Sequence, residues 1–281
     1  MRTPPTSLDA AFTARAVPVG SARHLSYLFA APPVRAPLLG IYALLAEWLA
    51  LLDPATETTV AQVKLAWWQE EMVRLSSGSA VHPVSRYLAA QPGAAAAHFS
   101  ILTAAVEAAM LELSGVPLEL GADLEAQSTA LLAGPLRVAS LIGALQPDPA
   151  LDREALERAT QSLALAQYLT RSLRDYRRAA GVGRVPFAVD ELLTAGVENV
   201  DLLQPQAPAH LQAYLDSLRH KADASYADLA QAMPANARAN LRHLLVLAAL
   251  ERKQLHAARG SSAFAALKDM LLAWQTARRA I

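Results

Sequence analysis

A group of charged residues interrupts an apolar stretch in the second half of the chain. Gln167, Arg171, Arg174, Asp175 and Arg178 lie within twelve positions, and Arg184 follows shortly after. At 3.6 residues per turn, the residues from 167 to 178 share one face of a helix within roughly 80°. Guanidinium groups make paired hydrogen bonds to phosphate oxygens without a metal. The sequence therefore predicts an anion- or diphosphate-binding face built from Arg171, Arg174, Arg178 and Arg184.

The same residues allow an interpretation without a ligand. Asp175 can pair with Arg171 and Arg178 on a solvated helix, which would add only a few tenths of a kcal/mol. The apolar segment from Leu163 to Leu173 favours binding instead, because arginines there would be costly unless they lined a cavity. From the residues alone, both interpretations stay open.

The elements that must position these residues are predicted to be helices. Hydrophobic residues make up 53% of the 281 positions, largely as Ala and Leu, and only 12 are Gly. Apolar residues recur at helical spacing from about residue 22 to residue 279, and no alternating strand pattern exceeds four residues. We expect a single-domain, all-α helical bundle over residues 22–281, preceded by a flexible tail over residues 1–21.

Composition and missing motifs exclude several classes of function. The 25 basic and 25 acidic residues cancel, so no global field favours nucleic acid. Cysteine is absent, which excludes disulfides and suits a cytoplasmic location. There is no glycine-rich phosphate loop, His-Glu-x-x-His or Gly-x-Ser-x-Gly motif. The histidines, among them His243, are expected at surface or hydrogen-bonded positions and receive no role.

One segment raises the question of a membrane. Residues 36–52 are apolar but carry Glu47, and their length is at the short limit for a bilayer span. A buried core helix is therefore the preferred interpretation. Peripheral contact with the inner membrane remains an expectation because many helices are apolar on more than one side, although the sequence offers no evident basic amphipathic anchor.

Two groups of short motifs carry a family resemblance. The first contains Ser26-Tyr27-Leu28-Phe29, Leu39-Gly40-Ile41-Tyr42-Ala43, Trp67-Trp68-Gln69-Glu70-Glu71 and His82-Pro83. The second contains Leu173-Arg174-Asp175, Gly183-Arg184, Pro186 and Asp190-Glu191-Leu192. In order and spacing they resemble the squalene and phytoene synthase family over about residues 23–279. The resemblance implies the isoprenoid synthase fold, in which two Asp-x-x-x-Asp motifs on facing helices hold Mg²⁺ against substrate diphosphates.

The chain departs from that family pattern at the metal motifs. The first motif falls on Leu49 and Asp53, and the second on Asp175 and Ala179, so each keeps one carboxylate. Arg171 stands at the family's neighbouring Asn position. Asp53 and Asp175 are thus the candidate catalytic residues and the remnant metal positions. We expect no metal or other cofactor, with Mg²⁺ needed only if catalysis survives.

The resemblance also predicts where a ligand would lie. The pocket is expected between the helix containing Tyr42 to Asp53 and the helix containing Gln167 to Arg178, and its occupant would be an isoprenoid or lipid. The expected lining residues are Tyr42, Leu45, Leu49, Gln167 and Tyr168. If Tyr42, Leu45 and Leu49 fill this space, no ligand binds.

These observations favour a synthase-like protein that has lost Mg²⁺-dependent prenyl transfer. It would act as a ligand-binding or respiratory-complex assembly-type factor, because the Trp67 to Glu71 motif and Leu272-Ala273-Trp274 resemble the phytoene synthase-like complex I assembly factor branch. That branch implies a protein partner at the inner membrane. One alternative is an active transferase that condenses prenyl diphosphates head to head. Another is a purely structural helical interaction protein.

Overall fold

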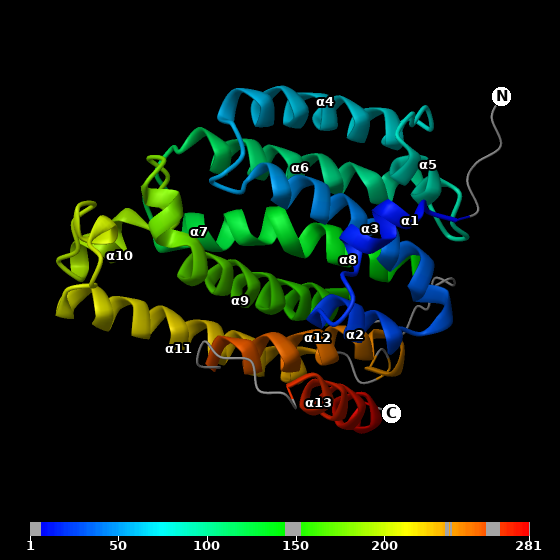
Figure 1. The fold of residues 1–281 in the computed structure, drawn as a ribbon. Coiled ribbons are helices and arrows are strands. Elements are labelled where there is room, and N and C mark those ends of the chain that lie inside the picture. Colours follow the sequence, from blue (N-terminus) through cyan, green and yellow to red (C-terminus); the bar gives the residue numbers. More distant parts are fainter. Residues whose placement is uncertain (1–6, 144–152, 234–235, 237, 257–264, 281) are drawn as a thin grey trace.

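The chain folds into layers of helices (Figure 1). A computed structural model describes residues 7–143, 153–233, 236, 238–256 and 265–280. In these residues the only pairing of extended backbone is an isolated bridge between Leu118 and Ala188. The all-α prediction is confirmed.

The observed helices closely follow the helical periodicity of the sequence. The first half contains α1 (Ala10–Ala16), α2 (Ala22–Leu28), α3 (Pro32–Leu51), α4 (Thr58–Ser76), α5 (Pro83–Ala89) and α6 (Ala96–Ser114). The second half contains α7 (Gly121–Ser128), the π-helical turn η1 (Thr129–Ala133), α8 (Gly134–Gly143), α9 (Arg153–Ala180), α10 (Val189–Thr194), the 3-10 turn η2 (Asp201–Leu203), α11 (Ala209–Ala232), α12 (Arg238–His256) and α13 (Ala265–Arg279).

The segment expected to be a flexible tail contains helix α1. Asp9 caps this helix by accepting a hydrogen bond from the Ala11 backbone N–H at 2.7 Å. Ala16 is buried at its end, and Arg15 pairs with Glu47 of α3 at 2.9 Å. The residues before position 7 lie outside the described part. The tail prediction therefore needs correction for α1, because a cap and an apolar contact hold this segment on the bundle.

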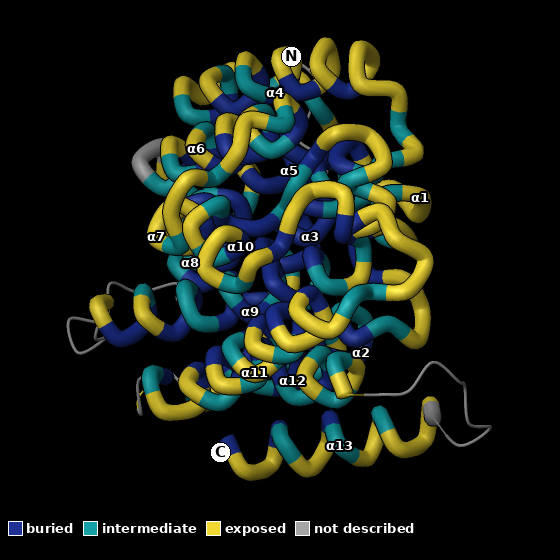
Figure 2. Tube along the Cα trace, turned by 90° about the vertical axis from the view of Figure 1, so that its left-hand side faces the viewer, coloured by how far each residue is buried: buried dark blue, intermediate teal, exposed yellow. Residues whose placement is uncertain are grey.

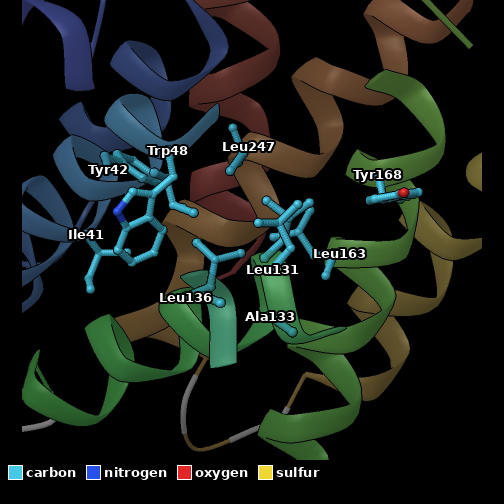
Figure 3. Packing of buried hydrophobic residues seen from close by; sticks show 14 of the residues in the cluster. Ile41, Tyr42, Trp48, Leu131, Ala133, Leu136, Leu163, Tyr168 and Leu247 are labelled. Atoms are coloured by element: carbon cyan, nitrogen blue, oxygen red, sulfur yellow. The ribbon is translucent and has the colours of Figure 1, made fainter. Parts of the chain in front are cut away.

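Helix α3 forms the centre of the N-terminal half. It is long and apolar enough to cross a membrane by length and composition, yet 67% of its most apolar window is buried inside the fold. Tyr42 and Trp48 lie in the hydrophobic core that also contains Leu247 of α12 (Figure 3). A Cβ atom on Gly40 would lie 2.5 Å from Leu88 Cδ2, so glycine permits the close approach of α3 and α5. The helix packs as the predicted core helix.

The Trp67 to Glu71 motif joins α4 to the start of α5. Glu71 is completely buried and accepts hydrogen bonds from the backbone N–H groups of Val81 and His82, at 3.0 and 2.8 Å. Arg74 Nε donates to the same carboxylate at 2.8 Å. Glu71, Arg74, Val81 and His82 are called the Glu71 corner below. The Trp68 ring is buried beside the His82 ring, as the core-packing interpretation expects, whereas Trp67 is partly exposed.

The C-terminal helices form the outer layers. Helix α9 packs along α11, while α13 lies on the outside of α12 and touches α2 (Figure 1). The last turn of α9 lies close to the turn that follows α3, because Arg178 reaches Asp53 at 3.0 Å. The outer position of α13 leaves one of its sides facing away from the rest of the chain (Figure 2).

Candidate functional site

A cavity of about 160 Å³ lies where the ends of α3, α6 and α9 meet. The segment after α9 closes one side of it. Its charged lining consists of Asp53, Glu112, Arg171, Arg174, Asp175, Arg178 and Arg184, and its apolar lining includes Leu49, Tyr168 and Ala179. The four predicted anion-binding arginines and both candidate aspartates are therefore brought to one cavity.

Asp53 is fixed by the turn that ends α3. Its Oδ1 accepts a hydrogen bond from the Ala55 backbone N–H at 2.9 Å. That bond, together with the nearby guanidinium of Arg178, lowers the pKa of Asp53 below its ordinary value. The side chain is 44% exposed, so its charge is held at the cavity mouth in contact with solvent.

Arg178 lies between the two candidate aspartates. Its Nη2 donates to Asp53 Oδ2 at 3.0 Å and lies 3.8 Å from Asp175 Oδ1. Asp175 Oδ2 also accepts from Arg174, at 3.1 Å from Nε and 2.7 Å from Nη2. These four residues, Asp53, Arg174, Asp175 and Arg178, are called the cavity rim. An organic cation thus occupies the space between carboxylates that come from two different parts of the chain.

Arg171 lies one turn deeper and is already paired. Its two terminal nitrogens donate to Glu112 of α6 at 2.7 and 2.6 Å, and its guanidinium lies 5.1 Å from the centre of the Tyr168 ring. Burial disfavours the charge on Arg171, but Glu112 outweighs this effect and raises its pKa. A ligand would have to displace Glu112 to reach this guanidinium. The sequence does not predict Glu112 as a site residue, because α6 carries two acids, Glu107 and Glu112, and helical spacing does not show which of them faces Arg171.

Arg184 connects the segment after α9 to the end of α3. Gly183 adopts φ +78°, a left-handed conformation that turns the chain back toward the cavity. The Arg184 Nη1 then donates to the Leu52 backbone carbonyl at 3.0 Å. This bond satisfies one of the carbonyls at the end of α3. Burial lowers the pKa of Arg184. Keeping this guanidinium charged inside the fold therefore costs desolvation free energy.

Three predicted lining residues lie elsewhere. Tyr42 and Leu45 are buried in the core and do not border the cavity. Gln167 Nε2 donates to both carboxylate oxygens of Glu251 on α12, at 3.1 and 2.8 Å. The pocket prediction is corrected for these three residues because the cavity begins lower on α3, at Leu49, and because α12 supplies a polar partner for Gln167.

The donor set does not fit the magnesium cluster that the family resemblance implies. Among the described residues, no group of three or more His, Cys, Asp or Glu is placed to hold a metal ion. Mg²⁺ takes oxygen ligands, yet both rim carboxylates are engaged by arginines, and Leu49 and Ala179 offer none. A divalent cation at this position would also face three nearby guanidinium groups.

Comparisons with known proteins agree with the fold. A dehydrosqualene synthase crystallised with a ligand superposes with a TM-score of 0.69 at 15% identity, covering 95% of this chain and 96% of the other. The squalene synthase HpnC from Alicyclobacillus acidocaldarius superposes with a TM-score of 0.59 at 17% identity, covering 96% and 93%. No curated protein sequence matches significantly. The model of the squalene/phytoene synthase family matches residues 17–269, and the chain therefore belongs to that family.

Proposed function

We propose that this family member binds a compact phosphate-bearing anion through its arginines and does not carry out Mg²⁺-dependent prenyl transfer. The observation that carries the proposal is the position of Arg178 between Asp53 and Asp175. A guanidinium can neutralise phosphate oxygens by direct hydrogen bonds. It cannot supply the bridging coordination by which Mg²⁺ stabilises a departing diphosphate.

The cost to catalysis would be large. Ionising an allylic diphosphate places charge on the leaving group, and site charges aimed at that group lower the barrier. Loss of one such donor typically lowers a rate by about 10² to 10³. Here two carboxylate positions of the expected metal cluster are Leu49 and Ala179. The rim therefore supports binding of a ground-state anion better than it supports bond cleavage.

The size of the cavity supports a small ligand. Its volume of about 160 Å³ is close to that of an engineered protein cavity that binds benzene, roughly 150 Å³. Pockets for larger organic ligands run from about 300 to 1,000 Å³. Two farnesyl or geranylgeranyl chains would exceed this space. A diphosphate group with a short or solvent-exposed tail fits it better.

The charges on the lining predict modest affinity. Arg171, Arg174, Arg178 and Arg184 face Asp53, Glu112 and Asp175, which leaves one net positive charge. Arg174 and Arg178 are 68% and 55% exposed, so they can turn from their carboxylates toward a phosphate. Arg171 is the least available because Glu112 holds both terminal nitrogens. Arg174 and Arg178 should therefore make the first contacts with the anion.

Titration with inorganic pyrophosphate in the presence of EDTA tests the proposal. Because a ligand stabilises the folded state that binds it, the Tm of the protein should rise with pyrophosphate concentration. Arg178→Ala and Arg174→Ala should each weaken this response at least tenfold. Arg158→Ala is the matched control, since Arg158 is 52% exposed on the same helix and pairs with Glu154, away from the cavity. An equal response in all variants would exclude the rim as the binding site.

A separate assay tests the loss of catalysis. With farnesyl or geranylgeranyl diphosphate and Mg²⁺, the protein should release no pyrophosphate. A squalene- or phytoene-type product would establish the alternative, an active prenyl transferase. Replacing Leu49 and Ala179 by Asp tests whether the scaffold can regain Mg²⁺ binding, measured as a Mg²⁺-dependent rise in Tm.

The proposed role in the cell follows from binding without turnover. The proposal is that such a protein acts as a cytoplasmic ligand-binding or assembly-type factor with a protein partner at the inner membrane. If neither pyrophosphate nor a prenyl diphosphate changes the Tm, the purely structural hypothesis replaces the binding one. The Tm measurements therefore distinguish the binding hypothesis from the purely structural hypothesis.

A further inference from the structure

Helix α13 carries an apolar stripe on the side that faces away from the bundle. Leu267, Met270, Leu271 and Trp274 follow the i, i+3, i+4, i+7 spacing of one helix face, and they are between 47% and 65% exposed. An adjacent side of the helix packs on the rest of the chain through small residues, including the buried Ala273 and Ala277. Figure 2 shows α13 as an outer helix with much of its length exposed. The stripe therefore contributes nothing to the described core.

The exposed charges around this stripe are positive. Lys268, Arg278 and Arg279 are exposed on α13. The single acid of this helix, Asp269, is paired with Lys253 of α12 at 2.6 Å. The Arg278 guanidinium lies 4.8 Å from the centre of the Trp274 ring, so a cation is held directly beside the apolar stripe. Apolar and cationic groups are thus presented by one surface.

The sequence around α13 is also rich in basic residues. Residues 238–279 contain eight Lys or Arg and two Asp or Glu, a net charge of +6. The whole chain has 25 of each, so the remainder carries −6. Within this range Arg252 is paired with Asp223 of α11, and Lys253 is paired with Asp269. The exposed basic residues of α13, which form no ion pair within the described part of the chain, are therefore the part of this excess that favours a partner of opposite charge.

We propose that α13 docks the protein reversibly on an anionic phospholipid bilayer. An amphipathic helix with apolar residues on one face and flanking cations enters the boundary between headgroups and acyl chains. Tryptophan favours this boundary, and lysine or arginine beside it is attracted by anionic headgroups. A second copy of the chain is a poorer occupant, because a symmetric contact through α13 would bring Lys268, Arg278 and Arg279 of both copies together.

The docking surface is separate from the cavity. None of the described residues that line the cavity belongs to α12 or α13. Pyrophosphate binding and bilayer binding can therefore be lost independently, and failure of one does not decide the other.

Sedimentation with lipid vesicles tests this inference on the full chain. The protein should bind vesicles of equal parts phosphatidylglycerol and phosphatidylcholine, bind pure phosphatidylcholine at least tenfold more weakly, and dissociate as salt is raised. Changing both Leu267 and Leu271 to Ser should weaken binding at least tenfold, as should changing both Lys268 and Arg278 to Glu. Val63→Ser is the matched control, because Val63 is an exposed apolar residue of α4 with 68% exposure. This variant should bind like the wild type.

Three results would overturn the proposal. One is the absence of wild-type binding to the anionic vesicles at low salt. A second is undiminished binding of both double variants, with circular dichroism showing that they are folded. The third is a dimer, detected by light scattering, that the Leu267 and Leu271 substitutions dissociate, since a second copy would then cover the stripe.

Discussion

The Glu71 corner and the cavity rim both pair a carboxylate with an arginine, but they differ in how far the pair is buried. At the corner, Glu71 is completely buried and receives hydrogen bonds from two backbone N–H groups and from Arg74. At the rim, Arg178 and Asp53 are half exposed and meet each other across the cavity mouth. The corner carboxylate serves the connection between α4 and α5, whereas the rim charges remain accessible to an incoming ion.

The charges of the Glu71 corner differ from those of the cavity rim in their burial and in the kind of group that binds them. Backbone donors hold the corner in one arrangement, and removal of the carboxylate would leave them without partners in the interior. Long side chains at the rim are screened by water and can exchange partners at little cost. Charge in an apolar sequence is therefore a sign of function only where it stays accessible. Three expected effects, from the largest to the smallest, test this distinction.

Replacing Glu71 should produce the largest loss of stability. Glu71→Gln removes the charge that Arg74 and two backbone N–H groups share, and we expect the free energy of unfolding to fall by about 3 kcal/mol. Burial opposes the charge on Glu71, but these donors outweigh it and lower its pKa. Denaturant unfolding at neutral pH measures the loss. Glu70→Gln is the control, since Glu70 is 72% exposed and pairs with the same arginine.

The comparison would fail if the two glutamate variants lost equal stability. Such a result would mean that burial of Glu71 adds nothing to its pairing with Arg74. Loss of pyrophosphate binding in folded Glu71→Gln would also contradict the distinction, because no residue of the Glu71 corner lines the cavity.

His243 extends the test to a buried polar side chain that lacks good partners. It is completely buried in α12, and neither ring nitrogen makes a well-formed hydrogen bond. The surface or hydrogen-bonded position expected from the sequence is therefore wrong for this residue. Burial lowers the pKa of His243 to about 4 from an ordinary 6.5. The folded protein keeps the ring neutral, while the unfolded chain takes up a proton below about pH 6.5.

Stability should consequently fall as the pH falls through this window. Between pH 7.5 and pH 5, the shift predicts a loss of about 2 kcal/mol in the free energy of unfolding. Because other groups titrate as well, the measurement is the difference in pH dependence between the wild type and His243→Leu. Parallel stability curves for the two proteins would show that the buried ring contributes no proton linkage.

The sequence predicted most of the helices because their apolar periodicity is local. The helical spacing expected from about residue 22 to residue 279 is seen in the described helices from α2 to α13. Motif spacing also predicted that Asp53 and Arg178 lie near the same cavity, although they are 125 positions apart in the chain. These successes rest on patterns along the chain and on a family resemblance that predicts a cavity between the ends of these two segments.

The side-chain partners at the site and the exposed stripe of α13 depend on which helix packs opposite each side chain. Gln167 shares a helix face with Arg171, yet Glu251 binds the first and Glu112 the second. Helical spacing cannot identify either partner. The exposed stripe of α13 was also missed, because Leu267 and Ala273 both count as apolar in a sequence and only packing shows which one is covered.

The smallest expected effect on stability belongs to Arg178, although this residue is central to the proposed function. Its pairs with Asp53 and Asp175 lie at 3.0 and 3.8 Å on an exposed rim. Exposed pairs of this kind contribute about 0.2 to 1 kcal/mol. Arg178→Ala should therefore lower the free energy of unfolding by less than about 1 kcal/mol, measured by denaturant unfolding without ligand, while Arg158→Ala changes it by a similar amount. A loss as large as that of Glu71→Gln would show that the rim holds α3 and α9 together, and the distinction between structural and accessible charge would then fail at the site where it matters most.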